Sequence, residues 1–186
     1  MNAERVSLIA AGKAAPGMAS AAVRILGDRL RGGVVVAPSA STDLGRLEFI
    51  AGGHPIPSAG SERGGRRALE IARATDPGDA LLVLISGGAS ALMAVPAEGL
   101  VLADKQRTTD TLLRAGADIH ALNTVRKHLS GIKGGQLAAA ARAPSWALAI
   151  SDVVGDDPSV IASGPTVADR STFEHAHAII RQFGGL

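Results

Sequence analysis

Residues 80–92 read ALLVLISGGASAL, the most apolar run of the chain followed at once by a small, glycine-rich turn. The run 80–85 is continuous in apolar residues instead of alternating, which indicates a strand buried on both faces, as in a parallel sheet covered by helices. The turn Ser86-Gly87-Gly88 then leads into a helix-forming stretch. This segment predicts an α/β fold in which the turn lies at the carboxyl end of a strand, where such folds bind ligands.

Further apolar runs end in the same way, in glycine, proline or polar residues, at 6–10, 33–37, 47–51 and 146–150. Helices are expected between the runs, at 16–30, 61–74 and 104–142, the last interrupted near 130–135. Ser171-Thr172-Phe173-Glu174 has the pattern of a capping box and predicts a final helix, which Gly184-Gly185 ends. This order predicts one α/β domain over residues 1–186, an α/β/α sandwich with a mostly parallel sheet.

The composition restricts the classes of function. Hydrophobic residues make up 46% and charged residues 19%, as in ordinary soluble globular domains. The sequence pI of about 9.5 rests on a formal net charge of only +2, and aromatics make up 2%, so no nucleic-acid partner is expected. The absence of cysteine excludes disulfides and thiolate sites. Neither a secretory signal nor an apolar run of membrane-spanning length is found, so we expect a cytoplasmic protein without a membrane partner.

Two glycine turns follow the first and third expected strands. In the first, Gly12 leads into a helix whose free N–H groups, with the charge of Lys13, suit a phosphate or carboxylate. A solvated lysine is the alternative, and the order of a Walker A loop is absent. In the second, Gly52-Gly53-His54-Pro55, the proline stiffens the loop. His54 could donate to a hydroxyl or phosphate, or be structural.

The turn after the most apolar run, 80–85, is the third candidate. Gly87 and Gly88 let a ligand approach the backbone closely, while Ser86 and Ser90 offer hydroxyls to an anion. A serine nucleophile is the rival interpretation, but the Gly-x-Ser-x-Gly elbow of hydrolases is absent. Capping of the next helix by Ser86 would leave the glycine pair unexplained.

Positive charge is concentrated in residues 123–135. On a helix, Asn123, Arg126 and Lys127 share a face, and Lys133 follows just before a glycine pair. The planar guanidinium of Arg126 can bind a carboxylate or phosphate through two parallel hydrogen bonds. Because no acidic residue is interleaved, the segment favours an anion site over a solvated basic face.

Carboxylates follow the last expected strand. Asp152, Asp156 and Asp157 could hold Mg²⁺, which takes one or two carboxylates together with substrate phosphate. Asp152, closest to the strand end, could instead accept the proton of an attacking hydroxyl. Asp156 and Asp157 precede Pro158 and also suit a simple turn. The residues alone indicate a small anionic ligand and are compatible with phosphoryl transfer.

The segments GKAAPGM, GGHPIPS, SGGASAL, NTVRKHLSGIKGG and SDVVGDDPSVIASGPT closely resemble those of the glycerate 2-kinase family, many of whose members are labelled hydroxypyruvate reductase. The resemblance runs from about Val6 to the end of the chain. It implies a Rossmann-like domain, paired in the family with a second α/β domain, and transfer of the ATP γ-phosphate to the 2-hydroxyl of D-glycerate with Mg²⁺. By the resemblance Lys13, Arg126 and Asp152 are catalytic, and the substrate or phosphate contacts are His54, Ser86, Gly87, Gly88, Ser90, Asn123 and Lys133.

Three places depart from the family pattern. Ala89 stands where a third glycine is usual, Ser58 stands where an aspartate is usual, and Pro38-Ser39-Ala40 lacks the lysine-containing sequence that usually follows its strand. The 186 residues lack the second domain, so a separate C-terminal half or self-association into a homo-oligomer is expected. One alternative is a non-catalytic domain that binds glycerate or another anion. The other, an NAD-dependent hydroxypyruvate reductase, is disfavoured because the Gly-x-Gly-x-x-Gly fingerprint is missing.

Overall fold

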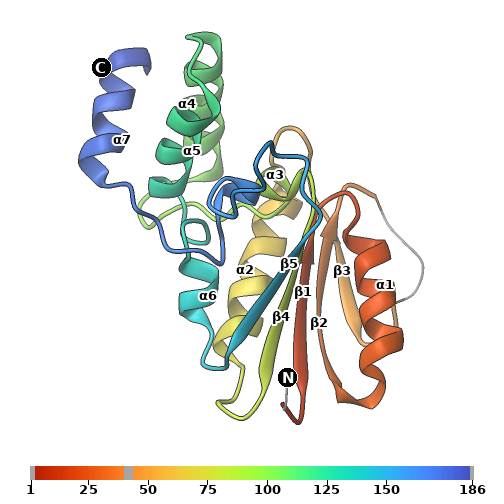
Figure 1. Cartoon of the computed structure of the whole chain (residues 1–186). Coiled ribbons are helices and arrows are strands. Elements are labelled where there is room, and N and C mark those ends of the chain that lie inside the picture. The colour runs from red at the N-terminus through yellow and green to blue at the C-terminus, as the bar shows by residue number, and fades with distance from the viewer. Residues whose placement is uncertain (1–2, 40–43, 185–186) are drawn as a thin grey trace.

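The computed structural model describes residues 3–39 and 44–184, in which five strands form one sheet in the order β3-β2-β1-β4-β5 (Figure 1). The strands are β1 (Val6–Ala11), β2 (Leu30–Ala37), β3 (Leu47–Ala51), β4 (Ala80–Ile85) and β5 (Ser145–Ala149). All neighbouring strands pair in parallel. The expected α/β fold is therefore confirmed, and the described sheet is parallel throughout.

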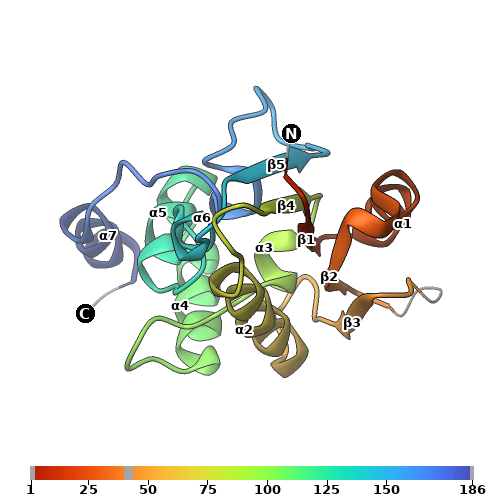
Figure 2. The same ribbon diagram turned by 90° about the horizontal axis from the view of Figure 1, so that it is seen from below.

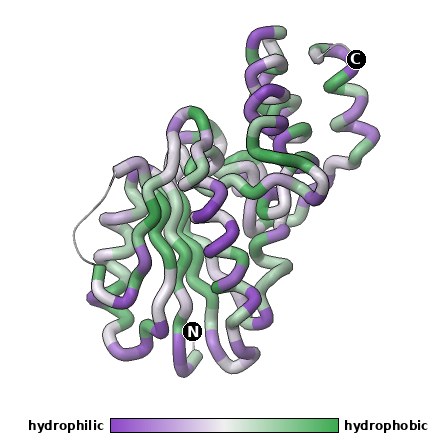
Figure 3. The backbone as a smooth tube through the Cα atoms, turned by 180° about the vertical axis from the view of Figure 1, so that it is seen from behind, coloured by the Kyte–Doolittle hydropathy of each residue, from purple (hydrophilic) through white to green (hydrophobic). Residues whose placement is uncertain are grey.

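Alternate residues of the central strands contribute to two apolar layers. Ile9 and Val83 pack on the side of α2 (Ala59–Arg73), and Leu8 packs on the side of α1 (Ala15–Leu26). Seen from below, α1 covers one face of the sheet and α2 the other (Figure 2). The hydropathy colouring shows the central strands as a continuous hydrophobic band (Figure 3). Burial on both faces explains why these runs are continuous and not alternating.

A group of helices stands beyond the carboxyl ends of the strands (Figure 1). It contains α4 (Leu102–Arg114), α5 (Ile119–His128) and α7 (Phe173–Ile179), which continues into a π-helical turn over Ile180–Gly184. These helices have a small core of their own, made by Leu112, Leu122, Val125 and Ala176. Two short helices, α3 (Ala89–Leu92) and α6 (Gln136–Ala140), connect this group to the sheet.

Several helix boundaries differ from the expectation. The region 104–142 is three helices, because Gly116 adopts φ +81° and Asp118 caps α5 by accepting a hydrogen bond from the Ala121 N–H at 2.8 Å. The first helix ends at Leu26, followed by a 3₁₀ turn over Gly27–Arg29, since the chain must turn back to enter β2.

The final helix begins one residue later than the sequence pattern indicates. Its cap is Thr172, whose hydroxyl accepts from the His175 N–H at 3.2 Å, so the expected pairing of Ser171 with Glu174 is wrong. The hydroxyl of Ser171 is used instead by Asp169, at 2.8 Å. Of the expected glycine stop, Gly185 lies outside the described residues.

The strand β5 is not buried on both faces as its apolar run predicts. Leu148 is 58% and Trp146 42% exposed, because β5 lies at the edge of the sheet and α1 packs mainly on β1, β2 and β4. Apolar runs of edge and central strands look alike in sequence. Across the described residues, we find no helix that combines the length and the apolar character needed to cross a membrane.

Candidate active site

The turns after β1 and β4 form one hydrogen-bonded unit. The Ala14 N–H donates to Ser86 Oγ at 3.0 Å, the Lys13 N–H to the Gly87 carbonyl at 2.9 Å, and the Ala15 N–H to the Gly12 carbonyl at 3.2 Å. The backbone N–H groups of Lys13, Ala14 and Ala15 are thus used within the protein and are not free for an anion. Ser86 does not cap its own helix; it supports the turn that carries Lys13.

Two glycines after β4 leave room for side chains from other turns. A Cβ built on Gly87 would lie 2.7 Å from Asp152 Oδ2, and one built on Gly88 would lie 3.1 Å from His54 Nε2 and 3.5 Å from Lys13 Cγ. Residues from the turns after β1, β3 and β5 therefore meet at the turn after β4. The convergence follows from the parallel sheet, which places the carboxyl ends of its strands at one edge.

The three converging side chains are free to meet a ligand. Lys13, His54 and Asp152 are exposed, and within residues 3–39 and 44–184 none of them makes a side-chain hydrogen bond or ion pair. A cation, a potential donor and a carboxylate thus surround a turn that has no side chains of its own at Gly87 and Gly88. Such an arrangement can neutralise a phosphoryl group and accept a proton at neighbouring positions.

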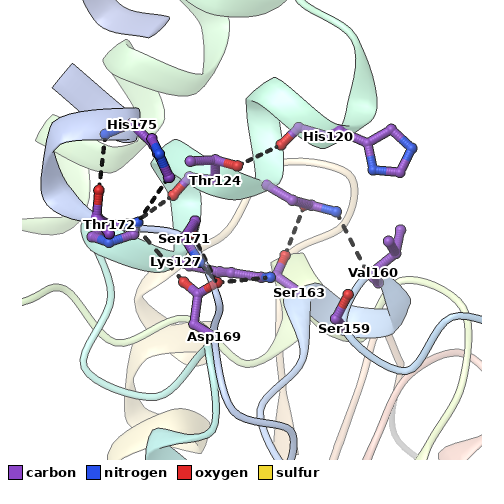
Figure 4. A network of polar contacts seen from close by, with 12 residues as sticks. His120, Thr124, Lys127, Ser159, Val160, Ser163, Asp169, Ser171, Thr172 and His175 are labelled. Carbon is purple, nitrogen blue, oxygen red and sulfur yellow. Dashed lines mark hydrogen bonds and ion pairs between the residues drawn. The ribbon is translucent and has the colours of Figure 1, made fainter. Parts of the chain in front are cut away.

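Other residues expected to bind a ligand form an internal network. The Lys133 ammonium, in a side chain only 3% exposed, donates to the Ser90 carbonyl at 2.8 Å and to Ser90 Oγ at 3.0 Å. Ser163 Oγ lies 2.9 Å from Ser90 Oγ and donates to Asn123 Oδ1 at 2.9 Å. Asn123 Nδ2 reaches the carbonyl of Val160 at 3.5 Å, the last link of this chain of contacts (Figure 4). Most of the hydrogen-bonding groups of Ser90, Asn123 and Lys133 therefore hold the site's wall together.

Sequence reasoning missed Ser163. This residue adopts φ +60° between Ala162 at φ +53° and Gly164 at φ +62°, a left-handed run that non-glycine residues seldom adopt. The run turns the Ser163 hydroxyl into the network. The only sequence signal is the adjacent Gly-Pro pair, which marks a turn but does not identify the serine.

Lys127 faces away from the site. Its ammonium contacts Asp169 Oδ1 at 3.3 Å, and Asp169 also accepts from the N–H of Ser171 at 3.0 Å (Figure 4). Partial burial opposes ionisation of Asp169, but the hydrogen bonds from Ser171 and the charge of Lys127 outweigh it and lower the pKa of the carboxyl. An acid distant in sequence therefore neutralises part of the basic helix face, against the expectation of an unpaired cluster.

Arg126 lies between two adjacent cavities. One, of about 470 Å³, is also lined by Asp152 and Asp157, and the other, of about 550 Å³, by Lys105 and Lys133. Arg126 and Ser90 line both cavities. Across the part of the chain that the structure describes, the guanidinium has no hydrogen-bond or ion-pair partner, and burial lowers the pKa of Arg126. Its donors are thus available to an anion.

Lys105 was also missed by the sequence analysis. Its side chain is 6% exposed and its ammonium donates to the carbonyl of Leu129 at 2.7 Å. Burial, and then the charge of Arg126, lower the pKa of Lys105 to about 7. A signal was present: Arg107 and Arg114 of the same helix each pair with an aspartate three or four residues earlier, whereas Lys105 has no acid at those spacings.

The three aspartates expected to bind metal are only partly brought together. Asp152 and Asp157 line the same cavity, whereas Asp156, at φ +50°, lines a hollow under β5. The Ser159 N–H donates to Asp157 at 2.8 Å and lowers the pKa of that carboxyl. Within the described residues no three histidine or carboxylate side chains cluster closely enough to enclose an ion. Two carboxylates still fit Mg²⁺, which takes one or two together with phosphate oxygens and water.

The geometry can be compared with known proteins. The sequence model of a family described as "Domain of unknown function (DUF4147)" matches residues 1–185. The chain belongs to the DUF4147 family. This DUF4147 chain is 47% identical over 179 residues to a protein of Pyrococcus horikoshii named glycerate 2-kinase, covering 96% of the chain and 40% of that protein. It is 43% identical over 187 residues to a protein of Thermotoga maritima named D-glycerate 2-kinase, covering 99% of the chain and 45% of that protein.

The fold of the DUF4147 chain agrees with these relatives. The crystal structure of glycerate kinase from Thermotoga maritima superposes with a TM-score of 0.95 at 42% identity, covering 100% of this chain and 45% of that one. A second solved structure, of a Pyrococcus horikoshii protein, gives a TM-score of 0.91 at 46% identity. The DUF4147 chain thus spans less than half the length of these relatives.

Two of the departures from the family pattern are accommodated locally in this DUF4147 chain, and Ala40 of the third lies outside the described residues. Ala89 is 1% exposed and begins α3, where its methyl group joins the core beside the sheet. Ser58 caps α2: its hydroxyl accepts from the Ser61 N–H at 3.4 Å, and Ser61 Oγ accepts from the Ser58 N–H at 3.0 Å. Serine and aspartate are both good caps, so the exchange preserves the start of the helix.

Proposed function

We propose that this chain is the acceptor-binding part of a D-glycerate 2-kinase, which transfers the γ-phosphoryl group of ATP to the 2-hydroxyl of D-glycerate. One observation carries the proposal: the guanidinium of Arg126 and the carboxylate of Asp152, both without a partner among the described residues, line the same cavity. D-glycerate has a carboxylate and a hydroxyl on adjacent carbons and matches this pair. The relatives named glycerate kinase support the assignment.

Each side chain has a role that its surroundings allow. Arg126 binds the acceptor's carboxylate through two parallel hydrogen bonds. Asp152 accepts the proton of the 2-hydroxyl as that oxygen attacks the γ-phosphorus, and Lys13 neutralises charge on the transferring phosphoryl group. His54, beside Gly88, donates a hydrogen bond to the phosphoryl or hydroxyl oxygen. Catalysis then consists of positioning and charge stabilisation, without a covalent intermediate.

Asp152 and Asp157 would hold Mg²⁺, and Asp152 would also accept the proton. When bound, the ion neutralises charge on the nucleotide phosphates. Both carboxylates line the cavity that Arg126 also lines, so the cation and the acceptor's carboxylate occupy neighbouring positions. Asp156, on the other side of its turn, contributes no oxygen to this cavity.

The proposal is tested with a chimera in which this chain replaces the matched part of the Thermotoga maritima D-glycerate 2-kinase. With Mg-ATP and D-glycerate, ³¹P NMR is expected to show 2-phosphoglycerate. Asp152→Asn is expected to reduce turnover by about 100-fold or more, the usual contribution of a general base. Asp28→Asn, at an exposed aspartate in the turn after α1, is the matched control and is expected to retain turnover.

Three outcomes would contradict the proposal. A chimera with the parent's circular dichroism spectrum that binds D-glycerate but transfers no phosphate would support the non-catalytic alternative. Oxidation of NADH in the presence of hydroxypyruvate would support a reductase. Full turnover by Asp152→Asn would remove the proton-accepting role assigned to that carboxylate.

A further inference from the structure

The cavity between α4, α5 and the loop before α6 is lined by five basic side chains and one carboxylate, Asp110. Three of the basic side chains, Lys105, Arg126 and Lys133, have no acidic partner among the described residues. Lys105 is 6% and Lys133 3% exposed, and Arg126 lies beside both. Among the described residues, none of the three forms an ion pair. The acids of α4 are already engaged, since Asp104 pairs with Arg107 at 2.6 Å and Asp110 with Arg114 at 2.9 Å. The charge of this cavity is therefore not neutralised by the protein.

Unpaired buried cations destabilise a fold, because each loses hydration and repels the others. Burial together with Arg126 and Lys105 lowers the pKa of Lys133 well below its ordinary value. Apolar residues at these positions would give a more stable fold than buried cations. The cluster therefore indicates an anionic ligand that supplies the missing negative charge.

The N–H groups that have no acceptor within the protein show which of the three cations can bind such a ligand. Lys133 already gives its hydrogen bonds to Ser90 and to the carbonyl of Ala162. Lys105 makes one hydrogen bond, to the carbonyl of Leu129, which leaves two of its three N–H groups free. Arg126 has all of its donors free among the described residues. Lys105 and Arg126 are therefore the side chains with donors left for such a ligand, whereas Lys133 holds the wall behind them.

The neighbouring cavity restricts the class of ligand. Arg126 and Ser90 line both cavities, and the second one contains Asp152. If the anionic group of a ligand lies at Lys105 and Arg126, a group on the next atom of that ligand lies toward the cavity that contains Asp152. The remaining wall near Lys105 is partly apolar, with Ile56 and Leu113, which suits a small carboxylate better than a polyphosphate.

We propose that this cavity is the carboxylate subsite for a small 2-hydroxy acid, and that Lys105 binds the carboxylate together with Arg126. The identity of the acid rests on the proposed function, but the binding step does not require phosphoryl transfer.

Binding at this subsite is coupled to proton uptake. Without ligand, the Lys105 ammonium loses its proton near pH 7, and a bound carboxylate favours the charged form. No histidine lines the described cavity, so the proton is taken up by a lysine, and Lys105 is the lysine with N–H groups left for the ligand. The charged groups around it are, on α5 and the following loop, Arg126 and Lys133, and on α4, Asp104, Arg107, Asp110 and Arg114.

The test is calorimetric titration of the purified chain with D-glycerate at pH 7.5, in Hepes and in Tris, whose different ionisation enthalpies report protons taken up. The wild type is expected to take up between about half a proton and one proton per ligand. Lys105→Met is expected to abolish the uptake and weaken binding about tenfold or more. Lys105→Arg, which keeps a permanent charge, is expected to retain most of the affinity without the uptake.

The matched control is Lys127→Met, which removes a lysine of α5 that pairs with Asp169. It is expected to keep both the affinity and the uptake, and glycerol, which lacks the carboxylate, is expected not to bind. A folded wild type that does not bind D-glycerate, binding without proton uptake, or unchanged affinity in Lys105→Met would each overturn the inference. Lys105-dependent binding with no phosphoryl transfer by the chimera would refute the proposed function alone, whereas transfer independent of Lys105 would refute this inference alone.

Discussion

The hydroxyl of Ser86 accepts a hydrogen bond from the backbone N–H of Ala14 at 3.0 Å, joining two turns that are 72 residues apart in sequence. The strands that carry these turns, β1 and β4, are direct neighbours, with Ala11 opposite Ile85. The backbone of Lys13 is thereby fixed relative to Gly87, the residue beside Asp152. The cation proposed to bind phosphate is thus held at a set place beside the turn that Asp152 also approaches, which favours catalysis through orientation.

The contact between the two turns predicts that alanine substitutions at Gly12, in the turn, and at Gly17, in α1, have opposite effects on stability. Gly12→Ala would place a Cβ 2.6 Å from the carbonyl oxygen of Ser86 at φ +128°, so we expect the free energy of unfolding to fall by about 2 kcal/mol or more. Gly17→Ala meets no atom within 4 Å and lies inside α1, so we expect a gain of about 0.5–1 kcal/mol. Urea unfolding of both variants measures the difference. Equal stabilities would mean that the two turns are not tightly joined.

Gly87→Ala is expected to reduce phosphoryl transfer without unfolding the chain. The new Cβ would lie 2.7 Å from Asp152 Oδ2, and this exposed carboxylate can move aside. Moving a reacting group by about 1 Å reduces turnover by about 10-fold to 100-fold. Gly78→Ala, in a turn with no atom within 4 Å, is the control. Turnover in the chimera is compared for both variants, and normal turnover by Gly87→Ala would show that Asp152 has no fixed catalytic position.

Lys105→Met is expected to stabilise the unliganded chain. The pKa of this lysine is about 7 in the folded state and 10.5 in the unfolded state. Below pH 7 the folded chain carries the full cost of a buried charge, and between pH 7 and 10.5 that cost is progressively relieved, so wild-type stability rises with pH. The advantage of the variant is therefore largest below pH 7, about 1–4 kcal/mol, and declines toward pH 10.5.

Thermal melts of the wild type and Lys105→Met from pH 5.5 to pH 10 measure this advantage. Lys127→Met serves as the comparison, because it removes an ion pair and is not expected to stabilise the chain. A Lys105→Met variant no more stable than the wild type at pH 6 would indicate that the buried ammonium is already compensated.

The exposed edge strand predicts self-association at high concentration. Leu148 is 58% and Trp146 42% exposed on β5, and the described residues place no strand on its outer side. Exposed apolar edges favour pairing with another chain. Sedimentation equilibrium is expected to show an oligomer that Leu148→Lys weakens. A wild-type monomer across the concentration range would contradict this prediction.

The sequence was sufficient for the sheet and for the convergence of Lys13, His54 and Asp152. Buried parallel strands have a distinctive apolar pattern, and their carboxyl ends necessarily share an edge. The exposure of β5 could not be read in advance, because strand order depends on pairing between distant segments. The same holds for the break before α5, which depends on Gly116 in a stretch otherwise favourable to helix.

The sequence predicted only in part which polar residues are available to a ligand and which are paired within the protein. A run of basic residues indicated an anion site. The sequence could not distinguish Arg126, which has no partner in the described part of the chain, from Lys127, which Asp169 neutralises from 42 residues away. Lys105 differs from other lysines on helices because it is buried and its pKa is lowered, and this burial arises from tertiary packing. Its lack of an acidic neighbour along the helix was the one local indication.

The central claim is that this chain itself binds the acceptor through Arg126. Titration of D-glycerate into the purified wild type and into Arg126→Ala, with circular dichroism spectra to establish that both are folded, tests it most directly. We expect saturable heat from the wild type and none from the variant at the same concentrations. Equal affinity in the two proteins, or no binding by the folded wild type, would contradict the claim.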